Sequence, residues 1–101
     1  MKQWTFITHH AAVLALLANQ PRITAREIAL DAGITERTVR MIIRDLEKDG
    51  YIEKVREGRG ARYTVNPELP IRHRAQSEKA VGQFLEVLGW NLPQPDPPRN
   101  I

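Results

Sequence analysis

The chain has 101 residues, of which 42% are hydrophobic and 27% are charged, a composition typical of one small globular domain. It has no cysteine, which excludes disulfides, thiol redox sensing and cysteine-ligated metal. The net charge of +3 is a mild basic excess. Whether this positive charge is spread over an ordinary surface or forms a face that binds a polyanion depends on where the arginines lie.

The N-terminal sequence MKQWTFITHHAAVLALLANQ predicts a folded helix rather than a secretory signal. Thr and His interrupt its apolar run early, and no apolar run in the chain reaches the roughly 18–20 residues that a membrane span needs. Residues 2–7 are expected to form a short strand or an arm. Thr8 is predicted to cap a helix over about 9–19, which is apolar almost all round and ends before Pro21. We expect a cytoplasmic protein.

Two closely spaced helices follow, and each has a clear N-terminal signal. Thr24 and Glu27 form a capping box, in which the hydroxyl accepts the N–H of the third residue and the carboxylate reaches back to the cap. This pattern predicts a helix over about 25–32 that ends at Gly33. Thr35 then caps a second helix. Because so short a turn separates the two helices, they must cross steeply, which predicts a helix-turn-helix.

A β-hairpin is predicted after Gly50, where the second helix ends. YIEKVR (51–56) and RYTV (62–65) contain strand-forming residues, and the Gly-rich sequence EGRGA joins them. Asn66-Pro67 breaks the second strand.

A last helix is predicted over about 72–89, because apolar residues recur there at spacings of three and four. Its apolar stripe is interpreted either as part of the intramolecular core or as a dimer seam. We favour the seam, because a terminal helix after a compact domain has few internal partners. The apolar stripe of this helix comprises Val81, Phe84, Leu85 and Leu88.

Residues 91–101 hold four of the seven prolines and are expected to form a disordered or polyproline-like tail.

The helix over 35–49 has an apolar side and a basic side when its residues are placed about 100° apart. The apolar side comprises Val39, Ile42, Ile43 and Leu46. The basic side comprises Arg37, Arg40, Met41, Arg44 and Lys48.

A charged stripe opposite an apolar one is usually only the solvent-facing side of a helix. Here the context favours double-stranded DNA as a partner, since a tight turn precedes the helix and a hairpin with further arginines follows it. An α-helix fits the major groove, where Arg reads guanine and Thr or Met meets a thymine methyl. The arginines of the hairpin would contact the backbone or the minor groove.

Other kinds of site find little support in the sequence. His9 and His10 are adjacent, so on a helix they point about 100° apart, and with His73 they lack the carboxylates or cysteines of a metal site. The glycines at 58–60 are not followed by a helix, so they do not form a phosphate-binding loop. We therefore predict no metal, no cofactor and no enzymatic activity.

The run AREIALDAGITERTVRMIIRDLEKDGYI, with the hairpin after it, resembles winged helix-turn-helix transcriptional regulators of the MarR-like type. Ala29 matches the small residue of the first helix, Gly33 the glycine of the turn and Ile34 the apolar residue after it. Val39 matches an inward position of the recognition helix. The resemblance covers about residues 4–89.

The resemblance implies a mainly α fold with a small β-hairpin (α+β), that is, a winged helix-turn-helix with a C-terminal helix. The expected division is a DNA-binding domain at 1–70, a dimerisation helix at 71–90 and a tail at 91–101. Base contacts would come from Thr35, Glu36, Arg37, Thr38, Arg40, Met41 and Arg44. Backbone contacts would come from Arg56, Arg59 and Arg62. A homodimer would be joined through Val81, Phe84, Leu85 and Leu88.

Full-length MarR-like regulators are longer, with extra helices around a ligand pocket for which this chain has little room. No small-molecule effector is therefore assigned. The alternative function is a winged-helix module that binds another protein, in which the basic stripe would face an acidic partner or solvent.

Overall fold

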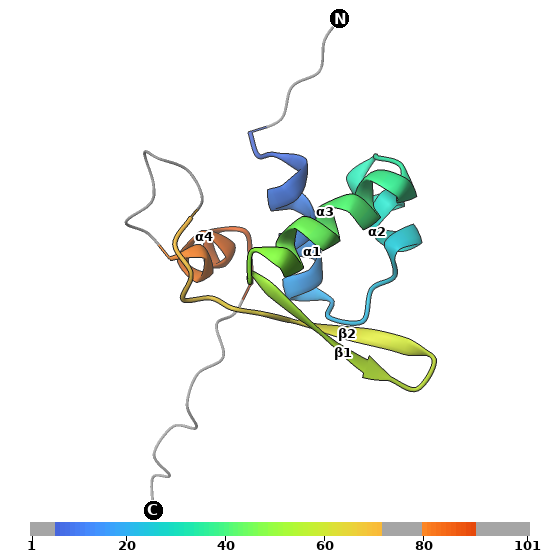
Figure 1. Cartoon of the computed structure of the whole chain (residues 1–101). Coiled ribbons are helices and arrows are strands. Elements are labelled where there is room, and N and C mark those ends of the chain that lie inside the picture. The colour runs from blue at the N-terminus through green and yellow to red at the C-terminus, as the bar shows by residue number, and fades with distance from the viewer. Residues whose placement is uncertain (1–5, 72–79, 91–101) are drawn as a thin grey trace, which may run out of the picture.

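The computed structural model describes residues 6–71 and 80–90 (Figure 1). The described elements are, in chain order, α1 (His9–Asn19), α2 (Ala25–Ala32), α3 (Glu36–Lys48), β1 (Ile52–Glu57), β2 (Gly60–Val65) and α4 (Val81–Val87). The predicted fold, mainly α with one small hairpin, is confirmed.

The predicted N-terminal signals cap the first three helices. The Thr8 hydroxyl accepts the N–H of the third residue of α1 at 3.1 Å, and Thr35 caps α3 in the same way at 3.1 Å. At α2 the capping box is complete: the Thr24 hydroxyl accepts the N–H of Glu27 at 3.2 Å, and the Glu27 carboxylate accepts the N–H of Thr24 at 3.0 Å. These bonds satisfy backbone donors that have no partner within the helices.

Gly33 makes the turn between α2 and α3. Its φ of 70° lies in the left-handed region, which costs glycine little and disfavours other residues. The following N–H, of Ile34, bonds to the carbonyl of Ala29 at 3.1 Å and closes the end of α2. The helix-turn-helix therefore has the geometry that its sequence predicts.

One hydrophobic core collects apolar side chains from all four helices and from β1. The predicted apolar side of α3 is fully within it, since Val39 and Ile42 are 0% and 1% exposed, and Ile43 and Leu46 are also buried. Among the described residues, no polar or charged side chain is buried. The other core side chains are Val13, Leu14, Leu17, Ala18, Ile23, Ile28, Ala29, Ile52, Val81 and Leu85.

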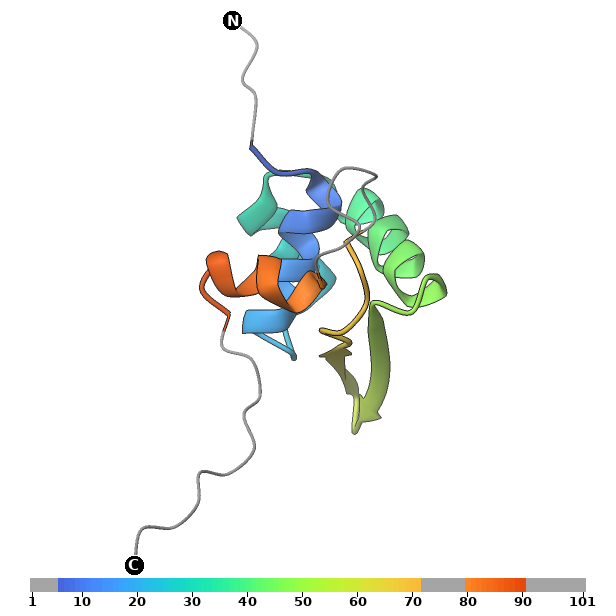
Figure 2. The same ribbon diagram turned by 90° about the vertical axis from the view of Figure 1, so that its left-hand side faces the viewer.

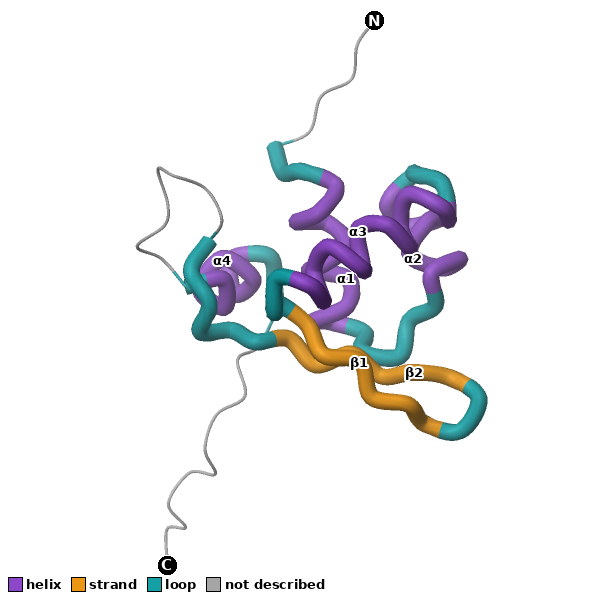
Figure 3. The backbone as a smooth tube through the Cα atoms, in the orientation of Figure 1, coloured by secondary structure: helices purple, strands orange, loops and turns teal. Residues whose placement is uncertain are grey.

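The hairpin projects beyond the ends of the helices (Figure 2). Its antiparallel strands pair from Ile52–Val65 to Glu57–Gly60. The first strand is thus shifted by one residue from its prediction, the second begins two residues earlier, and the turn shortens to Gly58 and Arg59 (Figure 3). The N–H of Tyr63 donates to the carbonyl of Pro21 at 2.8 Å. This bond fastens the hairpin to the loop between α1 and α2.

Helix α4 begins at Val81, later than the predicted start. Ala80 forms an isolated antiparallel bridge with Pro70, and the first N–H groups of the helix donate to Leu69 and Pro67 at 2.7 and 2.9 Å. The segment that follows the hairpin thus docks the start of α4 onto the body, on the side of α1 and α3 opposite to α2 (Figure 1).

The interpretation of Val81 and Leu85 as dimer residues is corrected by this docking. They are 5% and 0% exposed within their own chain, so their side chains are already buried and cannot form a seam between two copies. Phe84 and Leu88 are half-buried, and Val87 is 84% exposed. A stripe at helical spacing shows that a face is apolar, but not which surface covers it.

Parts of several predictions lie outside the described residues. These are residues 2–5 of the N-terminal arm, residues 72–79 of the last helix with His73, and the tail at 91–101. Phe6 and Ile7 form a bend before α1 rather than a strand. No described helix is long and apolar enough to cross a membrane.

Leu85→Ala should lower the free energy of unfolding by about 2–5 kcal/mol, because it removes a fully buried side chain and leaves a cavity. Leu30→Ala on α2 is the matched control, because Leu30 is 75% exposed, and it should change the free energy of unfolding by less than about 0.5 kcal/mol. Urea unfolding followed by circular dichroism measures both. Similar small effects for the two variants would contradict the packing of α4 within its own chain.

The capping box of α2 predicts a pH dependence. Hydrogen bonds from the Thr24 N–H and then from its hydroxyl hold the pKa of Glu27 below its ordinary value. A carboxyl whose pKa is lower in the folded than in the unfolded state stabilises the fold at neutral pH, and this stabilisation is lost as the pH falls through the folded pKa. Glu27→Gln keeps an acceptor oxygen but does not titrate.

The melting temperature of Glu27→Gln should therefore fall less than that of the wild type between about pH 6 and pH 3. Thermal scans by circular dichroism across this range measure the difference. An equal acid-induced loss in both proteins would show that the box does not depend on the charge of Glu27.

Candidate nucleic-acid interface

The side of α3 opposite the core is exposed and basic. Arg37, Arg40, Arg44 and Lys48 are exposed there, and Met41 is 49% exposed among them. Within residues 6–71 and 80–90, every Lys and Arg lies between positions 22 and 62, so α1 and α4 have none. The positive charge of these residues is therefore confined to the loop before α2, the helix-turn-helix and the hairpin.

The predicted residues at the start of α3 are bonded to one another. The hydroxyls of Thr35 and Thr38 lie 2.8 Å apart, and Thr35 also caps the helix. Glu36 accepts from Arg40 at 2.8 Å, one turn further along. These contacts fix the first turn, while Arg37 forms no ion pair within the described residues.

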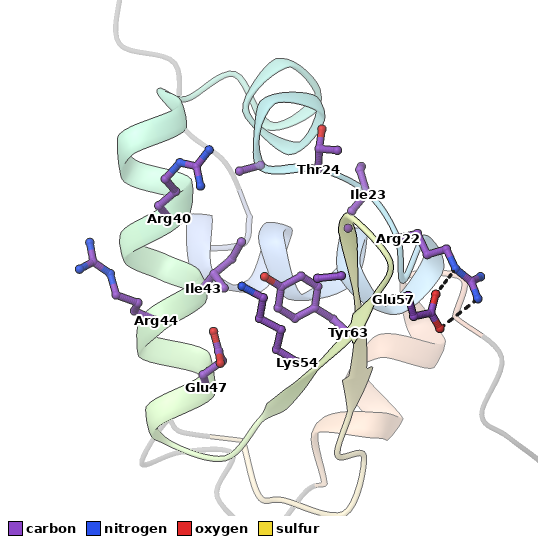
Figure 4. A pocket seen from close by; sticks show the side chains of 13 residues that line it. Arg22, Ile23, Thr24, Arg40, Ile43, Arg44, Glu47, Lys54, Glu57 and Tyr63 are labelled. Atoms are coloured by element: carbon purple, nitrogen blue, oxygen red, sulfur yellow. Dashed lines mark hydrogen bonds and ion pairs between the residues drawn. The ribbon is translucent and has the colours of Figure 1, made fainter.

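An open cleft of about 550 Å³ separates α3 from the hairpin (Figure 4). The start of α2 and the loop before it form its third wall. Four cations and two carboxylates line the cleft, so it is basic but not uniformly so. They are Arg22, Arg40, Arg44 and Lys54, with Glu47 and Glu57.

Tyr63 lines the cleft between the two acidic groups. It pairs with Lys54 across the hairpin and packs partly against the core. Burial raises the pKa of the Tyr63 hydroxyl, the nearby Glu47 carboxylate raises it further, and Arg40 opposes this effect. The hydroxyl therefore stays protonated at neutral pH and can donate a hydrogen bond into the cleft.

Glu57 joins two arginines at the edge of the cleft. One carboxylate oxygen accepts from Nε of Arg22 at 2.8 Å, and the other accepts from Nη2 of Arg22 at 3.3 Å and from Nε of Arg62 at 2.8 Å. These bonds, from Arg22 first and then from Arg62, hold the pKa of Glu57 below its ordinary value. Arg62 also donates to the hydroxyl of Thr64 at 3.2 Å.

Some of the residues predicted to contact DNA therefore line the cleft, and others lie outside it. Arg40 and Arg44 reach the cleft, while Arg37 and Met41 are exposed on α3 outside its lining. Of the predicted wing residues, Arg56 and Arg59 are exposed outside the cleft. Arg62 is half-buried and bonded within the hairpin, to a partner that the sequence did not indicate.

Two cations of the cleft were missed by sequence reasoning. Lys54 lies two residues after buried Ile52, so strand alternation places it on the inward face, and this signal was available in the sequence. Arg22 had no such signal, because its place beside the hairpin depends on the long-range bond between Tyr63 and Pro21.

A second, mostly apolar groove of about 750 Å³ lies between the start of α1, the end of α3 and α4. Leu14, Ile71 and Phe84 are among its apolar walls. At its rim, Nε2 of His10 lies 2.9 Å from a carboxylate oxygen of Asp45. The chain thus has more open space beside α4 than its length suggested.

Residues 9–53 match the family described as winged helix-turn-helix DNA-binding. This segment includes α1, α2, α3 and the first residues of β1. No curated protein matches the chain in sequence.

Solved structures of transcription regulators share the fold. MepR, the regulator of the Staphylococcus aureus multidrug efflux pump MepA, is 19% identical, with a TM-score of 0.55 over 79% of this chain and 56% of its own. The PcaV transcriptional regulator from Streptomyces coelicolor, solved with its natural ligand, is 21% identical, with a TM-score of 0.54 over 81% of this chain and 60% of its own.

The Mycobacterium tuberculosis MarR family protein Rv2887, solved with salicylic acid, is 23% identical, with a TM-score of 0.55 over 81% of this chain and 57% of its own. The chain thus spans less than two thirds of each of these proteins. The predicted winged helix-turn-helix, similar to that of MarR-type regulators, is confirmed as the fold, in which α3 is the second helix of the helix-turn-helix and the hairpin is the wing.

Proposed function

We propose that this protein is a transcription regulator that binds specific sites in double-stranded DNA, and that it is not an enzyme. The observation that carries the proposal is the exposed basic side of α3 beside a wing that bears further cations. The match of residues 9–53 to DNA-binding winged helices and the fold shared with transcription regulators support it. Its place of action would be the bacterial cytoplasm, where the DNA lies.

Recognition would rest on the first half of α3 in the major groove. Arg37 and Arg40 would bond to base edges, and Met41 would contact a thymine methyl. Thr35 and Thr38 fix the first turn and would contact bases or phosphates from there, while Glu36 would orient Arg40. Arginine can bond guanine in two places, which makes it the strongest reader in this set.

Phosphate contacts would set the position of α3 on the duplex. Arg44 on α3 and Lys54 on the wing both line the cleft, so a DNA strand beside α3 would lie near both of them. Arg56 and Arg59 lie further along the wing and would follow the backbone or enter the minor groove.

We also propose that two copies associate through α4. Val81 and Leu85 belong to the core, so the seam would consist of Phe84, Val87 and Leu88, which share one side at spacings of three and four. Val87 is 84% exposed. A domain of this size buries limited apolar surface by itself, so covering this side adds stabilisation. A two-fold dimer would bind a palindromic site.

The DNA proposal predicts binding that weakens steeply with salt, measured by fluorescence anisotropy on labelled duplexes. Selection of bound sequences from random duplex DNA would supply the specific site. Arg40→Ala should relax the base preference at one position, because it removes a base-edge contact worth about 1–3 kcal/mol. Arg59→Ala should weaken binding to all sequences alike, because it removes a phosphate contact.

The two variants control for each other, since each removes one exposed positive charge. Absence of duplex binding by the wild type at low salt would contradict the proposal and favour a protein partner instead. Identical effects of the two substitutions on every sequence would contradict the assignment of base reading to α3.

The dimer proposal predicts that Val87→Asp halves the mass measured by light scattering at micromolar concentration, because a carboxylate would be buried in the seam. Leu30→Asp is the matched control, since Leu30 is 75% exposed on α2, away from α4. A wild-type monomer, or an unchanged mass for Val87→Asp, would exclude this seam.

A further inference from the structure

Glu57 occupies the bonding edges of two arginines, Arg22, which lines the cleft, and Arg62, which lies beside Glu57 on the hairpin. Its two oxygens accept from Nε and Nη2 of Arg22, and one of them also accepts from Nε of Arg62. Paired N–H groups of this kind are the part of arginine that binds carboxylate and phosphate alike. A DNA phosphate would therefore compete with Glu57 for the same donors.

The position of the cluster makes this competition relevant to DNA. Arg22 and Glu57 both line the cleft between α3 and the wing, and the Arg22 side chain is 70% exposed. Figure 4 shows their ion pair across the cleft from α3. A phosphate entering there meets the positive charge of Arg22 with the negative charge of Glu57 beside it, rather than a free cation.

We propose that Glu57 is a specificity-determining residue, a carboxylate that occupies Arg22 and Arg62 in place of DNA phosphate and so limits binding to duplexes of any sequence. This role rests on the proposed function. Phosphate contacts carry no sequence information and supply most of the non-specific affinity. Withdrawing two arginines from them leaves backbone binding to Arg44, Lys54 and the outer wing, while the base contacts of α3 are unchanged.

The same contacts predict that the fold tolerates loss of the carboxylate. The pairs of Glu57 are partly exposed, with side-chain exposures of 70% for Arg22 and 36% for Arg62 and Glu57, and ion pairs of this kind add little to stability. The hairpin retains its strand pairing and the bond between Tyr63 and Pro21. Glu57→Gln thus changes mainly the charge of the cleft.

The test compares the wild type, Glu57→Gln and Glu53→Gln on one random-sequence duplex over a salt series. Glu53 is the matched control, because it is exposed on the same strand, lies outside the cleft and carries the same charge. Glu57→Gln should bind several-fold more tightly at about 0.1 M salt. Its slope of log affinity against log salt should steepen by about 0.9 for each additional phosphate that the released arginines bind. Glu53→Gln should stay close to the wild type.

A double variant separates released arginines from a general change in charge. Adding Arg22→Gln to Glu57→Gln should reverse the steepening by about one unit, because one released cation is lost again. Tighter binding by Glu53→Gln of the same size, or a slope of Glu57→Gln equal to or below that of the wild type, would overturn the role of Glu57.

A measurement on the wild type keeps the proposal testable if Glu57→Gln unfolds. The Nε–H resonances of Arg22 and Arg62 should stay in place when the random duplex is added, while that of Arg44 shifts. Shifts at Arg22 and Arg62 would show that phosphate displaces Glu57 and would overturn the role. If the wild type and all variants bind no duplex at low salt, the proposed function itself fails. If they bind but the wild type and Glu57→Gln have equal salt slopes, only the role of Glu57 fails.

Discussion

The apolar side of α3 packs against α1 and the rest of the core, and this contact sets the direction of every side chain on the opposite side. Val39 and Ile42 are almost completely buried, so a helix with 3.6 residues per turn must present Arg37, Arg40 and Arg44 to solvent. Without that burial, a helix of this length with four cations would be only marginally stable. The proposed readout of DNA therefore depends on an apolar contact that touches no DNA.

The wing adds a second constraint, which is its attachment to the loop between α1 and α2. The bond from Tyr63 to Pro21 and the contacts of Glu57 with Arg22 hold the hairpin beside the start of α2. The resulting cleft brings Lys54 opposite α3 and combines cations with carboxylates. The charge of the cleft thus depends on its carboxylates as well as on its arginines and lysine. In the proposed complex, local pairing more than net charge would decide which cations remain available to phosphate.

Helix α4 is joined both to the wing and to the core beneath α3. Its first turn is bonded to the segment that leaves the wing, and Leu85 enters the same core that holds α3. One side of the helix stabilises the domain, and the other exposes Val87. A helix with two apolar sides can therefore serve both the single chain and an assembly of two copies, and the proposed dimer would be rigidly joined to the DNA-binding elements.

The sequence by itself determined the local features of this protein. The caps at Thr24 and Thr35, the turn at Gly33 and the buried side of α3 follow from bonds and spacings within a few residues, and all appear as predicted. Only the tertiary structure decided the partners of groups that are distant in the chain. It placed Leu85 in the core, and it joined Arg22 and Arg62 to Glu57, because Arg22 and Leu85 meet partners that chain folding brings from far along the sequence.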